Sequence, residues 1–193
     1  MALPPWHVLL LLIPAFSGLY YLATNASASK RAFLDGWWFG VGFFGLSLSW
    51  IIEAFRVNPE DHGWAGPFAV ILITAGMALF PAFALASYKW FSHRIKFFSE
   101  GKILIFAANW AIFEWFRSWF LSGFPWNLLA TVWIPFEPIL QIISVIGTLG
   151  LSALTVFLAS SPALIFNKNY FFGACVVSFS FLIVVNMWVF GSW

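Results

Sequence analysis

Two acid–base pairs, each spaced three residues apart, are the features of this sequence that could do chemistry. Glu114 and Arg117 stand in the apolar run EWFRSWFLSGFPWN, and Glu53 and Arg56 repeat the spacing upstream. Residues three apart lie on one face of a helix. Charged groups inside apolar sequence are costly, which makes them candidates for function. Because arginine binds phosphate through a bidentate fork and a carboxylate can hold an ammonium group, the pairs could orient a lipid headgroup.

A structural role explains the same two pairs. In a low dielectric each carboxylate would be stabilised by its arginine, and the pairs would then only neutralise one another and fix helix packing. The sequence leaves both interpretations open. Both pairs are predicted to lie at the same depth, at the outer ends of their helices. This favours one shared site over two unrelated salt bridges.

A helix break is expected shortly after Glu114 and Arg117. Gly123, Phe124 and Pro125 form a Gly-Phe-Pro segment, and glycine and proline terminate helices. Gln141, which opens a later apolar run, could satisfy backbone groups in this broken region or touch a ligand, and the first role is favoured. We interpret these four residues as structural.

Aromatic and amide side chains are expected near the break, at the membrane interface. Trp126 and Asn127 follow the proline, and Trp50 lies at a similar predicted depth. Tryptophan is enriched in the aromatic belt of membrane proteins in general, so the indoles alone are weak evidence of a site. The candidate residues for lipid binding are Glu114, Arg117, Trp126, Asn127, Glu53, Arg56 and Trp50.

The amino-acid composition indicates the class of protein in which these residues lie. The chain has 193 residues, of which 62% are hydrophobic and 8% charged, whereas soluble domains are about 25% charged. Alternation typical of a barrel is absent, and irregular backbone exposed to lipid would leave polar groups unsatisfied. We therefore predict an all-α fold, a polytopic membrane helix bundle.

Six apolar runs approach the roughly 20 residues that a spanning helix needs. A seventh run, 128–136, is bounded by prolines and too short to cross, so a loop or re-entrant piece is expected there. No long repeat or linker is present, which predicts a single transmembrane domain over 1–193. The six spans are expected at 6–24, 36–55, 66–88, 103–121, 139–166 and 170–190.

Basic residues set the expected orientation. Loops rich in lysine and arginine face the cytoplasm, which places both termini in the periplasm. The net charge of +2 is small, and no basic run is interleaved with aromatics as a nucleic-acid groove requires, so no nucleic-acid partner is expected. The seven of the nine basic residues that fall in loops on one side are Lys30, Arg31, Lys89, Arg94, Lys96, Lys102 and Lys168.

Two further features have mainly packing interpretations. Gly36 and Gly40 form a GxxxG face, for which close packing within the bundle is favoured over dimerisation. Cys175, the single cysteine, has apolar neighbours and is expected to be a buried, inert thiol. The three histidines lack ligand spacing. We expect no metal site, no cofactor and no catalytic residue in this chain.

Two stretches carry a family resemblance. FEWFRSWFLSGFPWNLLA, followed by EPILQIISVIGTLGLSAL, resembles the membrane domain of bacterial apolipoprotein N-acyltransferases. The family pattern there is approximately E-W-x-R-G, G-F-P-W-x-x-x-G, P-x-x-Q and G-x-x-G-(small)-S-x-L. Ser118 stands where the family usually has glycine, and Ala130 and Val132 stand where a Gly-Tyr pair is common.

The resemblance implies a membrane portion that holds phospholipid and apolipoprotein for N-acylation of the lipoprotein's N-terminal cysteine, in the bacterial inner membrane. The family places catalysis in a periplasmic nitrilase-like domain with a Glu-Lys-Cys triad, which cannot be mapped onto this chain; Cys175 is not its counterpart. We therefore expect a truncated or split enzyme, inactive alone and, if split, completed by a separate nitrilase-type chain. The alternative is a non-enzymatic lipid-binding or transport protein, although a transporter is expected to show midplane charges and repeats.

Overall fold

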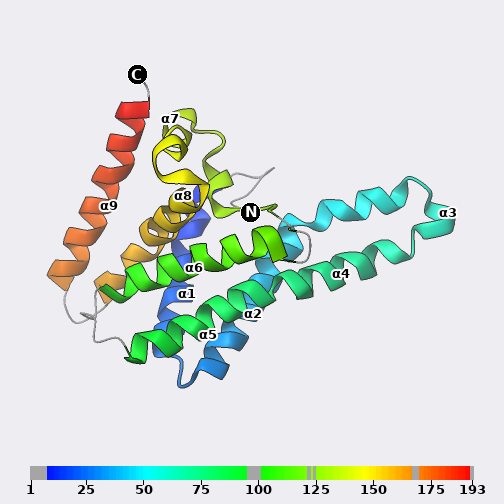
Figure 1. Ribbon diagram of the computed structural model, residues 1–193, viewed down its shortest axis with the longest axis horizontal. Coiled ribbons are helices and arrows are strands. Elements are labelled where there is room, and N and C mark those ends of the chain that lie inside the picture. The colour runs from blue at the N-terminus through cyan, green and yellow to red at the C-terminus, as the bar shows by residue number, and fades with distance from the viewer. Residues whose placement is uncertain (1–7, 95–100, 121–122, 124, 167–169, 192–193) are drawn as a thin grey trace.

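The computed structural model describes residues 8–94, 101–120, 123, 125–166 and 170–191, and these residues form helices and their connections without a strand (Figure 1). The predicted all-α membrane bundle is confirmed. Its α-helices are α1 Leu12–Asn25, α2 Ser29–Ser47, α3 Pro59–His62, α4 Ala65–Met77, α5 Leu79–Arg94, α6 Lys102–Trp119, α7 Glu137–Leu140, α8 Ile143–Ser160 and α9 Tyr170–Gly191. Its 3₁₀ helices are η1 Leu9–Leu11, η2 Ser49–Arg56, η5 Leu129–Trp133 and η6 Ser161–Phe166.

Three helical stretches of the described chain are long and apolar enough to cross a membrane. They are Ala65–Arg94, which joins α4 and α5, Ile143–Ile165 and Gly173–Phe190. A fourth results if α2 and η2, which meet at a bend of 43°, are taken as one span. The helix over Leu9–Asn25 is apolar but shorter. The expected total of six spans therefore stays a prediction.

Helix α5 extends further than expected. The basic loop expected after the span 66–88 is helical up to Arg94, and residues 95–100 lie outside the described part. Lys89 is buried there and donates from Nζ to the carbonyl oxygen of Thr24 at 2.8 Å, close to the end of α1. A cation at that place satisfies a helix carbonyl that has no partner within its own helix. The basic side chain thus fastens α5 to α1.

The core joins α1, α2 and α6 through aromatic rings. Phe16 of α1 is fully buried, and its ring centroid lies 5.5 Å from that of Phe39 and 4.9 Å from that of Trp110. Both contacts are edge-to-face, the arrangement that the ring quadrupole favours. This cluster places α6, which carries the candidate charged pair, in the middle of the bundle.

Helices α2 and α5 approach very closely. A Cβ built on Gly36 would lie 2.6 Å from the carbonyl oxygen of Pro81, and one on Gly40 would lie 2.7 Å from Cα of Ala78. Small residues permit such contact between backbones in a membrane. The predicted packing role of the two glycines within the bundle is confirmed. Beyond this contact, α2, η2 and α4 form an arm with α3 at its tip, on the right of Figure 1.

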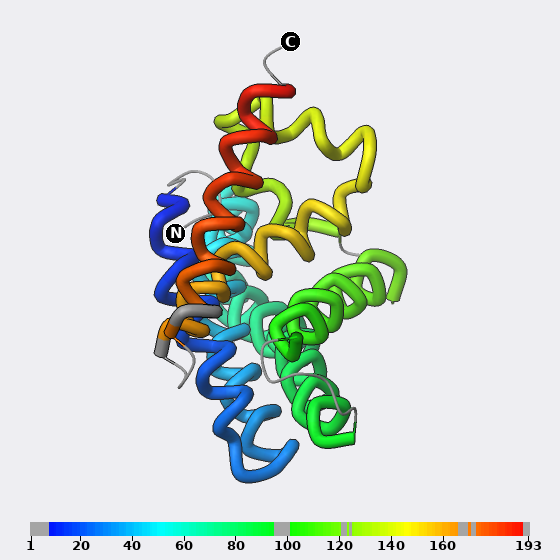
Figure 2. Tube along the Cα trace, turned by 90° about the vertical axis from the view of Figure 1, so that its left-hand side faces the viewer, coloured from blue at the N-terminus to red at the C-terminus, as the bar shows by residue number. Residues whose placement is uncertain are grey.

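Helix α9 packs along one side of the bundle, through η6 and α7 (Figure 2). Only 17% of its spanning window is buried. Cys175 is exposed on this helix, so the predicted burial of its thiol is wrong. Apolar sequence neighbours indicated the interior, but on a helix that lies against the outside of a bundle most side chains face the surroundings.

Candidate functional site

Helix α6 delivers both members of the central pair to the interior. Glu114 is 5% exposed and Arg117 is 2% exposed. The Glu114 oxygen Oε1 accepts the backbone N–H of Leu129 at 2.9 Å and the indole N–H of Trp110 at 3.2 Å. The carboxylate therefore anchors the start of η5 to α6.

Arg117 holds the segment just before η5. Its guanidinium donates to the carbonyl oxygen of Trp126 and lies 5.2 Å from the centre of the Phe44 ring, a cation–π arrangement. The pair thus fastens residues 126–129 to the helix, because both charges bind main-chain groups. The predicted neutralisation of each charge by the other stays a prediction. The role in headgroup binding stays a prediction.

The break after α6 has the expected residues and a conformation that requires them. Helix α6 ends at Trp119, and Gly123 has φ +80°, where an added Cβ would clash with the carbonyl oxygen of Ser118. Only glycine fits that place. The predicted helix break is confirmed, with Gly123 and Pro125 beyond the helix end; Phe124 lies outside the described residues.

Asn127 turns the chain back toward α2. It has a left-handed φ of 57°, which asparagine tolerates better than most residues. Its Nδ2 donates to the hydroxyl of Ser47 at 3.0 Å, at the end of α2. The amide therefore positions the segment by a side-chain bond to a second helix.

Two half-exposed indoles meet beside this segment. The ring centroids of Trp50, from η2, and Trp126 are 5.7 Å apart. Glu53 and Arg56, also on η2, form an exposed ion pair of 2.9 Å. The structure thus brings Trp50, Trp126, Asn127 and Arg117 into one connected group, while the Glu53–Arg56 pair lies on the surface of the arm.

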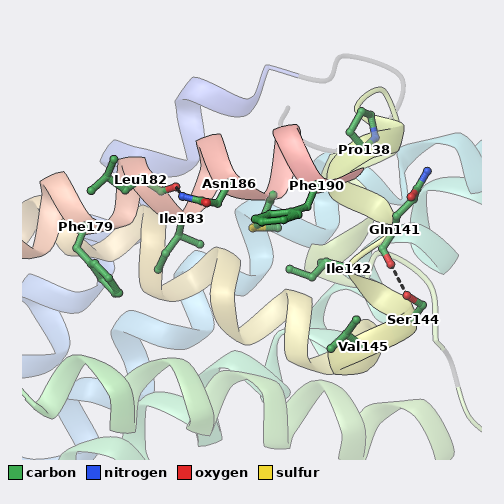
Figure 3. Close-up of a pocket in the computed structure, with 11 residues that line it drawn as sticks. Pro138, Gln141, Ile142, Ser144, Val145, Phe179, Leu182, Ile183, Asn186 and Phe190 are labelled. Atoms are coloured by element: carbon green, nitrogen blue, oxygen red, sulfur yellow. Dashed lines mark hydrogen bonds between the residues drawn. The ribbon is translucent and has the colours of Figure 1, made fainter. Parts of the chain in front are cut away.

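Gln141 occupies a different place from the broken segment. It follows α7, its backbone N–H bonds to the carbonyl oxygen of Glu137, and its carbonyl oxygen accepts the Ser144 hydroxyl at 2.7 Å. Its side chain lines a groove against α9 (Figure 3). The expectation that Gln141 satisfies backbone groups at the break after α6 stays a prediction.

Sequence reasoning missed one polar residue of the site. Ser152 of α8 is fully buried, and its hydroxyl accepts the N–H of Ala130 at 3.0 Å. A signal was available, because Ser152 and Thr155 are three residues apart and therefore share one face of a mostly apolar helix. Thr155 bonds the indole N–H of Trp133, so the two hydroxyls together hold η5 against α8.

A cavity of about 450 Å³ lies between α4, α5 and α6, next to the anchored segment. Its walls are mainly aromatic and aliphatic, Arg117 is its charged lining residue, and Gly123 also borders it. A mostly apolar cavity with a few polar groups is the usual form of a small-molecule binding site. The lining includes Gly76, Met77, Phe80, Phe83, Phe113 and Arg117.

Fold and site together define a membrane helix bundle with a mainly apolar cavity of about 450 Å³ beside a buried arginine. Residues 1–161 match the family model of the apolipoprotein N-acyltransferase N-terminal domain. The chain is 38% identical over 166 residues to the apolipoprotein N-acyltransferase of Caulobacter vibrioides, covering 84% of this chain and 30% of that protein. It is 36% identical over 178 residues to the apolipoprotein N-acyltransferase of Brucella melitensis, covering 86% of this chain and 32% of that protein.

The chain therefore belongs to the apolipoprotein N-acyltransferase family and corresponds to its N-terminal membrane portion. The family membership that the sequence motifs indicated is confirmed. The chain spans about a third of the length of the curated relatives that it matches.

Proposed function

We propose that this chain is the membrane portion of an apolipoprotein N-acyltransferase, which holds phospholipid and lipoprotein substrates for N-acylation of the lipoprotein's N-terminal cysteine. The observation that carries the proposal is the cavity of about 450 Å³ with Arg117 in its lining. Its aromatic walls suit an acyl chain, and a guanidinium suits a lipid phosphate. Family membership supplies the reaction class.

The anchored segment would define the mouth of this cavity. Arg117 fixes Trp126, and Trp126 packs against Trp50, so the two indoles stand beside the point where a headgroup would lie. Indoles are suited to a membrane interface because one part of the ring is apolar and the N–H is polar. In this proposal Arg117 both holds the loop and meets the phosphate.

We further propose that residues 1–193 act as one transmembrane domain in the inner membrane, with the Lys-rich loops cytoplasmic and both ends of the chain periplasmic. The end of α5 and the starts of α2 and α6, where several basic residues lie, are all in the lower left of Figure 1. Helices α3 and α7, whose first turns are acidic, lie at the right and the top. This separation of charge supports the orientation.

Arg117→Ala is expected to reduce the amount of phospholipid that co-purifies with the chain, whereas Arg94→Ala is not. Arg117 lines the cavity, while Arg94 is exposed and stacks over Trp90 at 3.8 Å. Quantitative lipid extraction from matched detergent preparations measures the difference, and a melting curve on each sample separates loss of lipid from loss of fold. Equal lipid content in two folded variants would contradict the headgroup role of Arg117.

The acyl-transfer chemistry is assigned in this proposal to a nitrilase-type domain with a Glu-Lys-Cys triad. Complementation of a bacterial strain depleted of its own acyltransferase tests this division of work. Growth is expected when the chain and a nitrilase domain are supplied together, and not when either is supplied alone. Growth with this chain alone would overturn the division. Failure of the pair, with lipid binding retained, would favour the non-enzymatic lipid-binding alternative.

A further inference from the structure

A small cavity of about 10 Å³ lies where α2, α5 and α6 meet, in the interior of the bundle. Both members of the central charged pair, Glu114 and Arg117, line it together with Trp110. These three residues are 5%, 2% and 4% exposed. The other lining residues are apolar and come from α2 and α5 as well as α6: Phe43, Phe44, Phe80, Pro81, Ala84 and Phe113.

The two carboxylate oxygens of Glu114 differ in their hydrogen bonding. Oε1 accepts the N–H groups of Leu129 and Trp110. Oε2 is buried as well, but it has no hydrogen-bond partner within the described part of the chain. Most buried polar side-chain atoms in proteins have at least one partner, which is either a protein group or an ordered water. A buried oxygen without a protein partner, on a residue that lines a cavity, therefore points to a bound molecule.

The volume of the cavity decides which molecule fits. A cavity needs about 10–15 Å³ to hold one water molecule, so this cavity admits one water and nothing with several heavy atoms, such as an ammonium headgroup. A metal cation is disfavoured on other grounds, because hard cations take about six oxygen ligands. Glu114 is the only lining residue with a side-chain oxygen, and the positive charge of Arg117 lies beside it.

A water molecule suits both charged groups. It can donate to a carboxylate oxygen and accept from a guanidinium N–H. Because arginine carries five N–H donors, Arg117 can donate to the carbonyl oxygen of Trp126 and to a water at the same time. If Oε2 carried a proton, it would donate to the same water. The site therefore does not depend on the protonation state of Glu114.

We propose that this cavity holds one ordered water molecule, which bridges Oε2 of Glu114 and the guanidinium of Arg117. The water supplies the hydrogen bond that Oε2 does not receive from the protein. Arg117 also lines the cavity of about 450 Å³, which shares Phe80 and Phe113 with the small one. The bridge thus holds the guanidinium at the wall of the larger cavity. The water site is formed by α2, α5 and α6 alone and does not require the proposed function.

A density map of the full chain that resolves ordered waters tests the bridge directly. A peak is expected at hydrogen-bond distance, about 2.5–3.2 Å, from both Oε2 of Glu114 and a guanidinium nitrogen of Arg117. Two results would overturn the proposal. One is the absence of this peak from a map that shows other buried waters. The other is a direct bond from Oε2 to a protein group, for example the hydroxyl of Ser152.

X-ray footprinting of the full chain in lipid nanodiscs tests the same site in a bilayer. Radiolysis of a bound water produces a hydroxyl radical, which oxidises the side chains next to it. Phe44, which lines the cavity, and Phe106 of α6, which does not, are each 2% exposed and are therefore a matched pair. Oxidation of Phe44 is expected to exceed that of Phe106 several-fold. Equal oxidation of the two rings would contradict a water in the cavity.

Ala84→Val provides an independent variant, because Ala84 lines the cavity and two added methyl groups are larger than one water. Ala159→Val is the matched control, since Ala159 is 5% exposed, against 3% for Ala84, and borders a separate groove of about 370 Å³. Ala84→Val is expected to lower the oxidation of Phe44 to the level of Phe106, and Ala159→Val to leave it unchanged. Unchanged oxidation of Phe44 in a folded Ala84→Val protein would overturn the proposal. If that variant does not fold, the comparison of Phe44 with Phe106 in the wild type decides.

Discussion

Gly40→Val is expected to destabilise the bundle by about 3 kcal/mol, at the upper end of the usual cost of overpacking. A Cβ at Gly40 would lie 2.7 Å from Cα of Ala78, and backbone atoms of a neighbouring helix cannot move away as a side-chain tip can. The substitution must therefore separate α2 from the junction of α4 and α5. The measurement is the free energy of unfolding in mixed detergent micelles titrated with a denaturing detergent.

Gly42→Val is the matched control for this experiment. Gly42 lies two residues further along α2, and a Cβ there would meet nothing within 4 Å. Both variants carry the same change in helix propensity, so the difference in their unfolding free energies isolates the contact with Ala78. Equal destabilisation by the two would show that α2 and α5 do not pack as closely as described.

Glu114→Ala is expected to release the segment that leads into η5. The variant leaves the backbone N–H of Leu129 and the indole N–H of Trp110 buried without their acceptor, at about 1–3 kcal/mol for each group. Glu114→Gln retains one acceptor oxygen and is expected to cost clearly less. Hydrogen exchange at the Leu129 amide, read by mass spectrometry, should accelerate in the alanine variant.

Glu60→Ala controls for the loss of a carboxylate as such, because Glu60 is exposed on α3. It is expected to leave both the exchange of Leu129 and the unfolding free energy unchanged. If Glu114→Ala behaves like this control, the carboxylate does not anchor η5, and its burial would have to serve another purpose.

The sequence predicted those features that depend on composition and local pattern. The scarcity of charges indicated a membrane bundle, the Gly-Phe-Pro run indicated the end of α6, and the Gly36–Gly40 spacing indicated a close helix pair. Each of these features depends only on the residues of one short stretch of chain and on the conformations that such a stretch can adopt in lipid. The family resemblance rested on the same local motifs.

The features that the sequence did not predict depend on contacts between distant segments. The spacing of Glu114 and Arg117 showed that they share a face of α6, but not that this face meets the main chain of 126–129. Lys89 was assigned to a loop, since nothing in its own neighbourhood identifies Thr24 as a partner 65 residues away. The exposure of Cys175 follows from where α9 lies, which the sequence of α9 cannot specify.

The most direct test of the central proposal is the lipid content of Gly76→Leu and Gly18→Leu variants, measured by native mass spectrometry. Both glycines are helical and have open space around an added Cβ, but only Gly76 lines the cavity beside Arg117. A leucine at Gly76 should fill that cavity without strain. We predict that the wild type and Gly18→Leu retain a bound phospholipid and that Gly76→Leu loses it. Retention of the same lipid by Gly76→Leu would contradict the proposal that this cavity holds the substrate chain.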